Sequence, residues 1–229
     1  MHSPWLFSLL VNMRSSAFNH TDIEALRSKL KANSAPVPCV DFGAGSKGST
    51  TTVSGIARRS LKRPKHARAL AALAQHIESE AVLELGTSLG LTSAYISRHT
   101  TALTTAEGNP HIRALALSNW RQLSVQNVRS FEGEFEQIWE GFADSTYDLI
   151  FIDGNHRGEA LMRYAKKSLS MLQPNGVLVC DDIHWSLDME QAWNDLCSMP
   201  EWTVQLDAFE WGLLTRNQAL KREHVCIRF

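Results

Sequence analysis

The sequence predicts an α/β fold: a doubly wound, mostly parallel sheet, with an N-terminal accessory helical segment and a C-terminal antiparallel hairpin. Three observations predict it. From Ala81 onward, short apolar runs alternate with segments of helical spacing, which is typical of parallel strands joined by right-handed crossovers. The first run, Ala81–Leu85, stops at a glycine-bearing turn that opens a helix. The 229 residues, 44% of them hydrophobic, can bury one sizeable core.

Residues 1–75 are predicted to form an accessory or lid segment, and residues 76–229 the sheet domain. The apolar stretch Pro4–Met13 has no preceding Lys or Arg and is too short for a membrane span, so we expect a docking helix rather than a signal peptide. A helix over Thr21–Ala32 is expected to begin at a Thr21 or Asp22 cap and to end before a proline-rich loop.

Two further features lie in the accessory segment. Residues 41–48 are rich in glycine, but no buried strand precedes them, which favours a turn or mobile flap over a nucleotide loop. Residues 58–68 gather six cationic side chains before a helix expected over residues 69–77. This basic run is either a solvated face or a lid over an anionic group.

Strands are predicted at 81–85, 102–107, 127–131, 148–153 and 177–181. Apolar spacing predicts a helix over residues 161–172, and Gln173–Gly176 is expected to end it and turn the chain into the fifth strand. Closing strands are expected at 202–206, 212–215 and 225–229. Because no long helix separates the first two of these, they are expected to form the antiparallel hairpin.

The turn after Leu85 is predicted to be the nucleotide loop of a Rossmann-like sheet, where the backbone approaches the ligand. A dinucleotide loop of G-x-G-x-x-G type would place glycines where the chain has Gly86, Ser88 and Leu91, so the pattern argues against NAD or FAD. Glu107 ends the next strand, 23 residues after Glu84, where a carboxylate can accept hydrogen bonds from both ribose hydroxyls. An ordinary tight turn and a solvated strand end are the alternatives.

Two later strands also end in acids, which are Asp153, Asp181 and Asp182. Because ligands bind beyond the carboxyl ends of parallel strands, these acids are expected at the same rim as Gly86 and Glu107. Three carboxylates repel one another, so a cation must offset them. A hard divalent ion such as Mg²⁺ is the simplest candidate.

The ordered set Glu84-Leu-Gly86-x-x-x-Gly90, Glu107-Gly-Asn-Pro, Asp153 and Asp181-Asp182 resembles class I S-adenosylmethionine-dependent methyltransferases. Within them it is similar to the catechol O-methyltransferase-like, metal-dependent family, over residues 75–200. The resemblance implies S-adenosylmethionine as cofactor and makes residues 76–229 the domain that binds it. It implies cofactor contacts from Glu84, Gly86, Ser88, Gly90, Thr92, Glu107 and Gly108, and a divalent metal, Mg²⁺ or another, held by Asp153, Asp181 and Asp182.

The chain departs from this family twice. Asp182 stands where the family has a metal-binding Asn, and His156 stands where it has a Lys thought to act as base. An imidazole can take a proton from a hydroxyl near neutral pH, so His156 and Asp153 are the predicted catalytic residues. Alternatively, His156 caps the next helix or joins the metal site. His184 is a second candidate base, and Trp185 either walls the substrate pocket or packs beneath it.

The resemblance therefore predicts methyl transfer to a hydroxyl of a small molecule, assisted by a divalent metal. The alternatives are a metal-independent methyltransferase acting on an amine or carboxylate, and an RNA-associated methyltransferase that uses the basic run. A net charge of -1 argues against nucleic acid as partner. Four cysteines without C-x-x-C spacing fit a reducing, cytoplasmic setting. Trp5–Val11 could bury itself in a homodimer or against the chain's own core.

Overall fold

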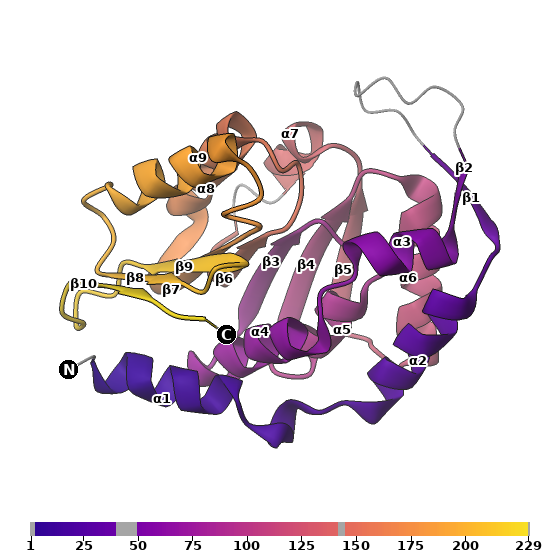
Figure 1. Cartoon of the computed structure of the whole chain (residues 1–229), viewed down its shortest axis with the longest axis horizontal. Helices are drawn as coiled ribbons and strands as arrows, with labels where there is room; N and C mark the ends of the chain where they lie inside the picture. The colour runs from indigo at the N-terminus through magenta and orange to yellow at the C-terminus, as the bar shows by residue number, and fades with distance from the viewer. Residues whose placement is uncertain (1–2, 40–49, 142–144, 229) are drawn as a thin grey trace.

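A computed structural model describes residues 3–39, 50–141 and 145–228. In this part of the chain, eight strands form one sheet in the order β10-β8-β9-β7-β6-β3-β4-β5 (Figure 1). The strands are β3 (Ala81–Leu85), β4 (Ala102–Glu107), β5 (Val128–Glu132), β6 (Tyr147–Ile152), β7 (Leu172–Asp181), β8 (Val204–Asp207), β9 (Trp211–Thr215) and β10 (Glu223–Cys226). A separate antiparallel pair joins β1 (Pro36–Pro38) to β2 (Thr50–Thr52).

The sheet topology confirms the predicted α/β, Rossmann-like fold. Strand β3 lies between β4 and β6, and all pairs from β5 to β7 are parallel. Strand β9 runs antiparallel to both β7 and β8, which gives the expected C-terminal hairpin. The last strand, β10, pairs in parallel with β8 at the edge of the sheet.

Helices cover both faces of the sheet. They are α1 (Pro4–Met13), α2 (Thr21–Ala32), α3 (Val53–Ser60), α4 (Pro64–His76), α5 (Leu91–Ser97), α6 (Pro110–Gln122), α7 (Phe135–Ile138), α8 (Gly158–Met171) and α9 (Leu187–Cys197), with short 3₁₀ turns at Ser16–Phe18 and Trp139–Gly141. Along β6, Leu149 and Phe151 face the core under the N-terminal helices, whereas Ile150 and Ile152 face the core under α8 and α9. This alternation follows from the two-residue period of a strand.

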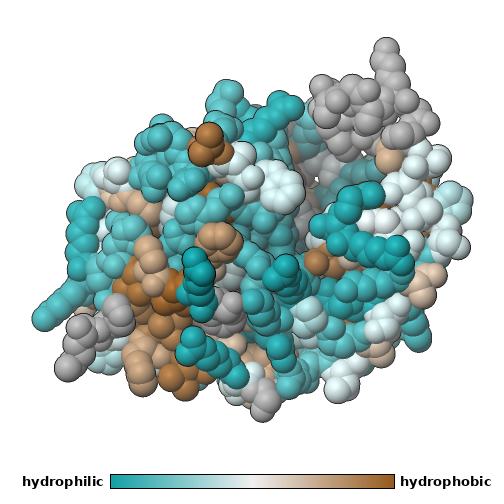
Figure 2. Space-filling view, in the orientation of Figure 1, coloured by the Kyte–Doolittle hydropathy of each residue, from teal (hydrophilic) through white to brown (hydrophobic). Residues whose placement is uncertain are grey.

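The N-terminal helices pack on the sheet domain. Helix α2 has the predicted bounds, and α1 buries Leu6, Leu9 and Met13 while it exposes Phe7 and Val11. Figure 2 shows apolar residues gathered around this end of the molecule, at the lower left. The helix expected over residues 69–77 begins earlier, at Pro64, because proline fits the first turn of a helix.

The predicted turn at Gln173–Gly176 is wrong, because these residues lie inside strand β7. Strand β7 already begins at Leu172, which pairs with Tyr147, and the next aligned pair is Leu149 with Val177. One residue of β6 therefore faces four of β7, so Pro174 and Gly176 produce a bulge within the strand instead of a turn before it.

The glycine-rich prediction over residues 41–48 lies outside the described residues. Among those that are described, no helix is both long enough and apolar enough to cross a membrane.

Candidate functional site

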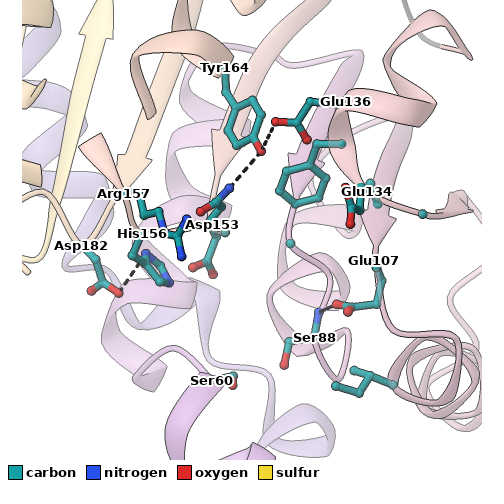
Figure 3. A pocket seen from close by; sticks show the side chains of 18 of the residues that line it. Ser60, Ser88, Glu107, Glu134, Glu136, Asp153, His156, Arg157, Tyr164 and Asp182 are labelled. Atoms are coloured by element: carbon teal, nitrogen blue, oxygen red, sulfur yellow. Dashed lines mark hydrogen bonds and ion pairs between the residues drawn. The ribbon is translucent and has the colours of Figure 1, made fainter. Parts of the chain in front are cut away.

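A cavity of about 590 Å³ opens at the carboxyl ends of the parallel strands. Figure 3 shows Asp153, His156 and Asp182 on one side of it and Ser88, Glu107 and Glu134 on the other. Most of the residues that line it are polar. They come from the carboxyl ends of the parallel strands and the loops after them, from α6, α7 and α8, and from the end of α3 and the segment after it: Arg59, Ser60, Lys62, Gly86, Ser88, Ala106, Glu107, Gly108, Ile112, Gly133, Glu134, Phe135, Glu136, Asp153, Gly154, Asn155, His156, Arg157, Tyr164 and Asp182.

The turn after β3 needs glycine at its first position. Gly86 has φ +111°, and a Cβ atom there would overlap the backbone carbonyl oxygen of Asp153. The backbone N–H groups of Gly86 and Thr87 both donate to the carbonyl oxygen of Ala106, each at 3.1 Å. These contacts fix the turn against β4 and β6, and the backbone of Gly86 lines the cavity.

Glu107 connects this turn to the neighbouring strand. Its Oε2 accepts a hydrogen bond from the backbone N–H of Ser88 at 2.9 Å, and its Oε1 accepts one from the backbone N–H of Asn109 at 3.0 Å. Burial raises the pKa of Glu107, and these backbone donors oppose the rise. A carboxylate has about four acceptor positions, so Glu107 can still accept hydrogen bonds from a ligand in the cavity.

Three of the predicted cofactor residues lie behind the cavity wall. Glu84 is fully buried; its Oε2 accepts hydrogen bonds from the hydroxyls of Ser93 and, at 2.7 Å, Thr105. Burial raises the pKa of Glu84 to about 8, although both hydroxyls lower it. Gly90 has φ +75°, and Thr92 is buried in α5. The cofactor roles of these residues remain predictions.

Gly90 has a visible packing role. A Cβ atom there would lie 2.6 Å from the indole nitrogen of Trp120, which donates a 2.7 Å hydrogen bond to the Gly90 carbonyl oxygen. Asn119 donates to the carbonyl oxygen of Leu89 at 2.8 Å. Helix α6 therefore holds the end of the turn through two side-chain donors.

Lys62 meets the predicted metal-binding acids. This residue lies between α3 and α4, and its Nζ is 3.0 Å from Oδ1 of Asp153 and also contacts Oδ2 of Asp181. Burial alone would lower the pKa of Lys62, but Asp153 and Asp181 outweigh it and raise the pKa. Burial and Asp153 raise the pKa of Asp181, and Lys62 opposes that rise.

The acids do not fit a resident divalent ion in this arrangement. Asp153 and Asp181 already share the Lys62 ammonium, and Asp182 lies 3.5 Å from Nδ1 of His156. Within residues 3–39, 50–141 and 145–228, no three His, Cys, Asp or Glu side chains are grouped so that they could hold a metal. The predicted metal therefore stays a prediction.

His156 lines the cavity and is partly exposed, and Asp182 lies beside its Nδ1 (Figure 3). Asp182 has φ +53°, and its backbone N–H donates to the carbonyl oxygen of Glu210 at 2.7 Å, which fixes the turn after β7. The other candidate, His184, pairs instead with Asp207, 2.8 Å from its Nε2. Trp185 is 72% exposed, with its ring 6.4 Å from that of His156, so it is not packed beneath the rim.

Sequence reasoning missed a polar network on the far wall of the cavity. The Tyr164 hydroxyl donates to Oε1 of Glu136 at 2.8 Å and accepts a 3.3 Å hydrogen bond from Asn155 (Figure 3). The ring of Phe135 packs beside Gly154, where a Cβ atom would lie 3.0 Å from it. Tyr164 fits the apolar spacing of its helix, so no pattern in the sequence indicates that its hydroxyl reaches the cavity.

The basic run of residues 58–68 is not a single charged face. Arg59 and Lys62 line the cavity, whereas Arg63 and His66 both pair with Glu210, at 3.1 and 2.8 Å. Arg68 donates to Asn19. The helical turn that begins at Pro64 separates these side chains in space, although they are close in sequence.

Comparisons with known proteins agree with this geometry. Residues 83–183 match the family described as "Methyltransferase domain". A protein of Mycobacterium sp. (strain JLS) that carries a provisional O-methyltransferase name is 27% identical over 115 residues, which are 48% of this chain and 51% of that protein. The chain thus spans about half the length of the curated relatives it matches.

Two solved structures share the fold. An O-methyltransferase from Bacillus cereus in complex with S-adenosylhomocysteine has a TM-score of 0.64 at 15% identity, over 86% of this chain and 91% of that one. The O-methyltransferase TomG from Streptomyces achromogenes, solved with S-adenosylmethionine, has a TM-score of 0.60 at 18% identity, over 68% and 81%. At these identities the likeness shows the fold alone.

Proposed function

From the match of residues 83–183 to the methyltransferase-domain family, and the resemblance of the chain to catechol O-methyltransferase-like enzymes, we propose that the chain transfers a methyl group from S-adenosylmethionine to a hydroxyl of a small molecule. One observation carries the proposal. The Gly86 backbone and the Glu107 carboxylate border the same cavity as Asp153 and His156. The proposed cofactor site and the candidate base therefore share one cavity.

The cofactor is proposed to lie along the Gly86 turn, with its ribose hydroxyls donating to Glu107. Ser88 and Gly108 border the same part of the cavity. When bound, S-adenosylmethionine supplies an already activated methyl group, so the protein's task is to align it with an acceptor oxygen. Tyr164 and Phe135 belong to the same wall and restrict the space that remains.

His156 is proposed as the general base. With its hydrogen on Nδ1, toward Asp182, the imidazole keeps the lone pair of Nε2 for the proton of the acceptor hydroxyl. As that O–H bond breaks, the oxygen bonds to the methyl carbon, and the electron pair of the C–S bond returns to sulfur. The Asp182 carboxylate, beside Nδ1, then stabilises the imidazolium. The Asp153 carboxylate, which lines the same cavity, adds to the negative potential around it.

Methyl transfer assisted by a divalent metal, which the sequence predicts, is a second form of the same function. It requires Asp153, Asp181 and Asp182 to bind a divalent ion after Lys62 has withdrawn from them. The metal-independent form requires no such rearrangement, and the buried Lys62 contacts favour it.

The accessory segment 1–75 is proposed to act as a lid over the cavity, because its residues Arg59, Ser60 and Lys62 line that cavity. A cytoplasmic setting and a homodimer through the exposed Phe7 and Val11 remain proposals. The RNA-associated alternative gains nothing from the basic run, since several of its cations pair within the chain.

A methyl-transfer screen tests the function. The chain would be incubated with methyl-labelled S-adenosylmethionine and a panel of catechols, phenols and hydroxylated metabolites, with Mg²⁺ or with EDTA. Transfer to a hydroxyl supports the proposal. Transfer confined to amines or carboxylates would contradict it.

A further inference from the structure

We propose that the Lys62 ammonium is the built-in cation of this site, standing where a divalent metal would otherwise neutralise the aspartates, and that removing it converts them into a divalent-cation site. The inference rests on the proposed function for its meaning in catalysis. Its geometry and its test are independent of methyl transfer.

The ammonium is buried among the carboxylates. The side chain of Lys62 is 15% exposed, that of Asp153 is 13% exposed and that of Asp181 is 4% exposed. Ionised carboxylates so placed repel one another strongly in a low-dielectric interior, and a cation between them offsets that repulsion. Lys62 supplies that cation from the chain itself.

The backbone at Lys62 is fixed by a hydrogen bond from helix α2. Its carbonyl oxygen accepts a 2.7 Å hydrogen bond from Nη1 of Arg27, a buried residue of α2. The Nε of Arg27 donates to Glu24 at 2.9 Å, and Glu24 also accepts from the Tyr95 hydroxyl at 2.9 Å. This chain of contacts ties Lys62 to α2 and α5, so its position is built into the fold.

A second connection joins the Lys62 segment to the loop of Asp182. Arg63, the next residue, pairs with the Glu210 side chain at 3.1 Å, and the Glu210 carbonyl oxygen accepts the backbone N–H of Asp182 at 2.7 Å. Glu210 therefore connects the segment of Lys62 to the turn that holds Asp182.

Lys62 can also act on a substrate. An ammonium has three donors, of which Asp153 and Asp181 account for two, and Lys62 lines the cavity. The third donor can hold the acceptor oxygen while its negative charge develops, a task that a divalent metal performs as a Lewis acid.

Binding of Mn²⁺ to the full chain tests the inference, by electron paramagnetic resonance and by calorimetry. Wild type is expected to bind no Mn²⁺ up to about 1 mM, whereas Lys62→Met is expected to bind one ion at least about tenfold more tightly than that limit. The double variant Lys62→Met/Asp181→Asn should lose that ion. Lys62→Arg, which keeps the charge, and Lys65→Met, from the same segment, should behave as wild type.

Two results would overturn the inference. One is Mn²⁺ binding by wild type that Asp181→Asn abolishes, and this comparison decides the matter even if Lys62→Met does not fold. The other is a folded Lys62→Met that binds no Mn²⁺. Calorimetry with S-adenosylmethionine on the same samples separates the two proposals, because failure of cofactor binding would refute the proposed function and leave the cation result standing.

Discussion

The backbone carbonyl oxygen of Asp153 occupies the space that a Cβ atom at Gly86 would fill. The two residues follow adjacent parallel strands, in which Leu85 pairs with Ile152, and the backbone N–H of Asp153 donates to the Leu85 carbonyl oxygen at 2.8 Å. The proposed cofactor turn and the first acid of the rim therefore share one backbone contact. A change at either one must move the other.

Gly86→Ala is expected to lower the free energy of unfolding by about 2 kcal/mol or more, because a Cβ atom both overlaps Asp153 and forces an L side chain into φ +111°. Gly141→Ala is the matched control, since a Cβ atom there meets Phe131 at 3.4 Å. Urea unfolding measures both. A Gly86→Ala protein as stable as the control would show that the turn can relax without cost.

Glu84 is expected to make stability depend on pH. Its pKa is about 8 in the folded chain, against 4.5 for an ordinary glutamate, so between those values the folded state keeps a proton that the unfolded chain has released. The free energy of unfolding should therefore fall as pH rises from about 4.5 to about 8, by on the order of a few kcal/mol, and then level off.

Glu84→Gln should remove this dependence, because a neutral amide cannot lose the proton. Urea unfolding of both proteins from about pH 5 to pH 9 should give a wild-type advantage that shrinks as pH rises. Glu80→Gln, at an exposed neighbouring position, should keep the wild-type slope. Parallel curves for wild type and Glu84→Gln would mean that Glu84 is ionised throughout.

His156→Gln is expected to lower turnover by about 10² to 10⁴-fold, the usual worth of a general base, while S-adenosylmethionine binds as before. His184→Gln is the control, since His184 pairs with Asp207. The acceptor found by the methyl-transfer screen serves as substrate. If both variants lost the same activity, or neither did, His156 would not be the base.

The sequence predicted the centre of the sheet well, because strands 81–85 and 102–107 have strong apolar runs and clear ends. It also predicted that Asp153, Asp181 and Asp182 share one rim with Gly86 and Glu107, which follows from the rule for parallel strands. All of these except Asp181 line the cavity, whereas Asp181 is buried against Lys62. These inferences depend on local patterns that persist in the fold.

The inward position of Lys62 could not be predicted in the same way. Six cations lie within residues 58–68, and nothing local distinguishes Lys62 from the others. Its inward position depends on Arg27, which is distant in sequence, and on the early start of α4 at Pro64. Gly90 likewise looked like part of a cofactor motif, but its packing against Trp120 appears only once α6 is in place.

The most direct test of the proposed cofactor site is calorimetric titration with S-adenosylmethionine. The proteins compared are wild type, Glu107→Gln and Glu132→Gln. Glu132 pairs with Glu107 across β4 and β5 but is exposed, so it is the matched control. We predict one site in wild type and Glu132→Gln, and about 10 to 100-fold weaker binding in Glu107→Gln, the effect of losing hydrogen bonds to a charged acceptor. Absence of binding to wild type, or equal affinity in all three proteins, would contradict the account.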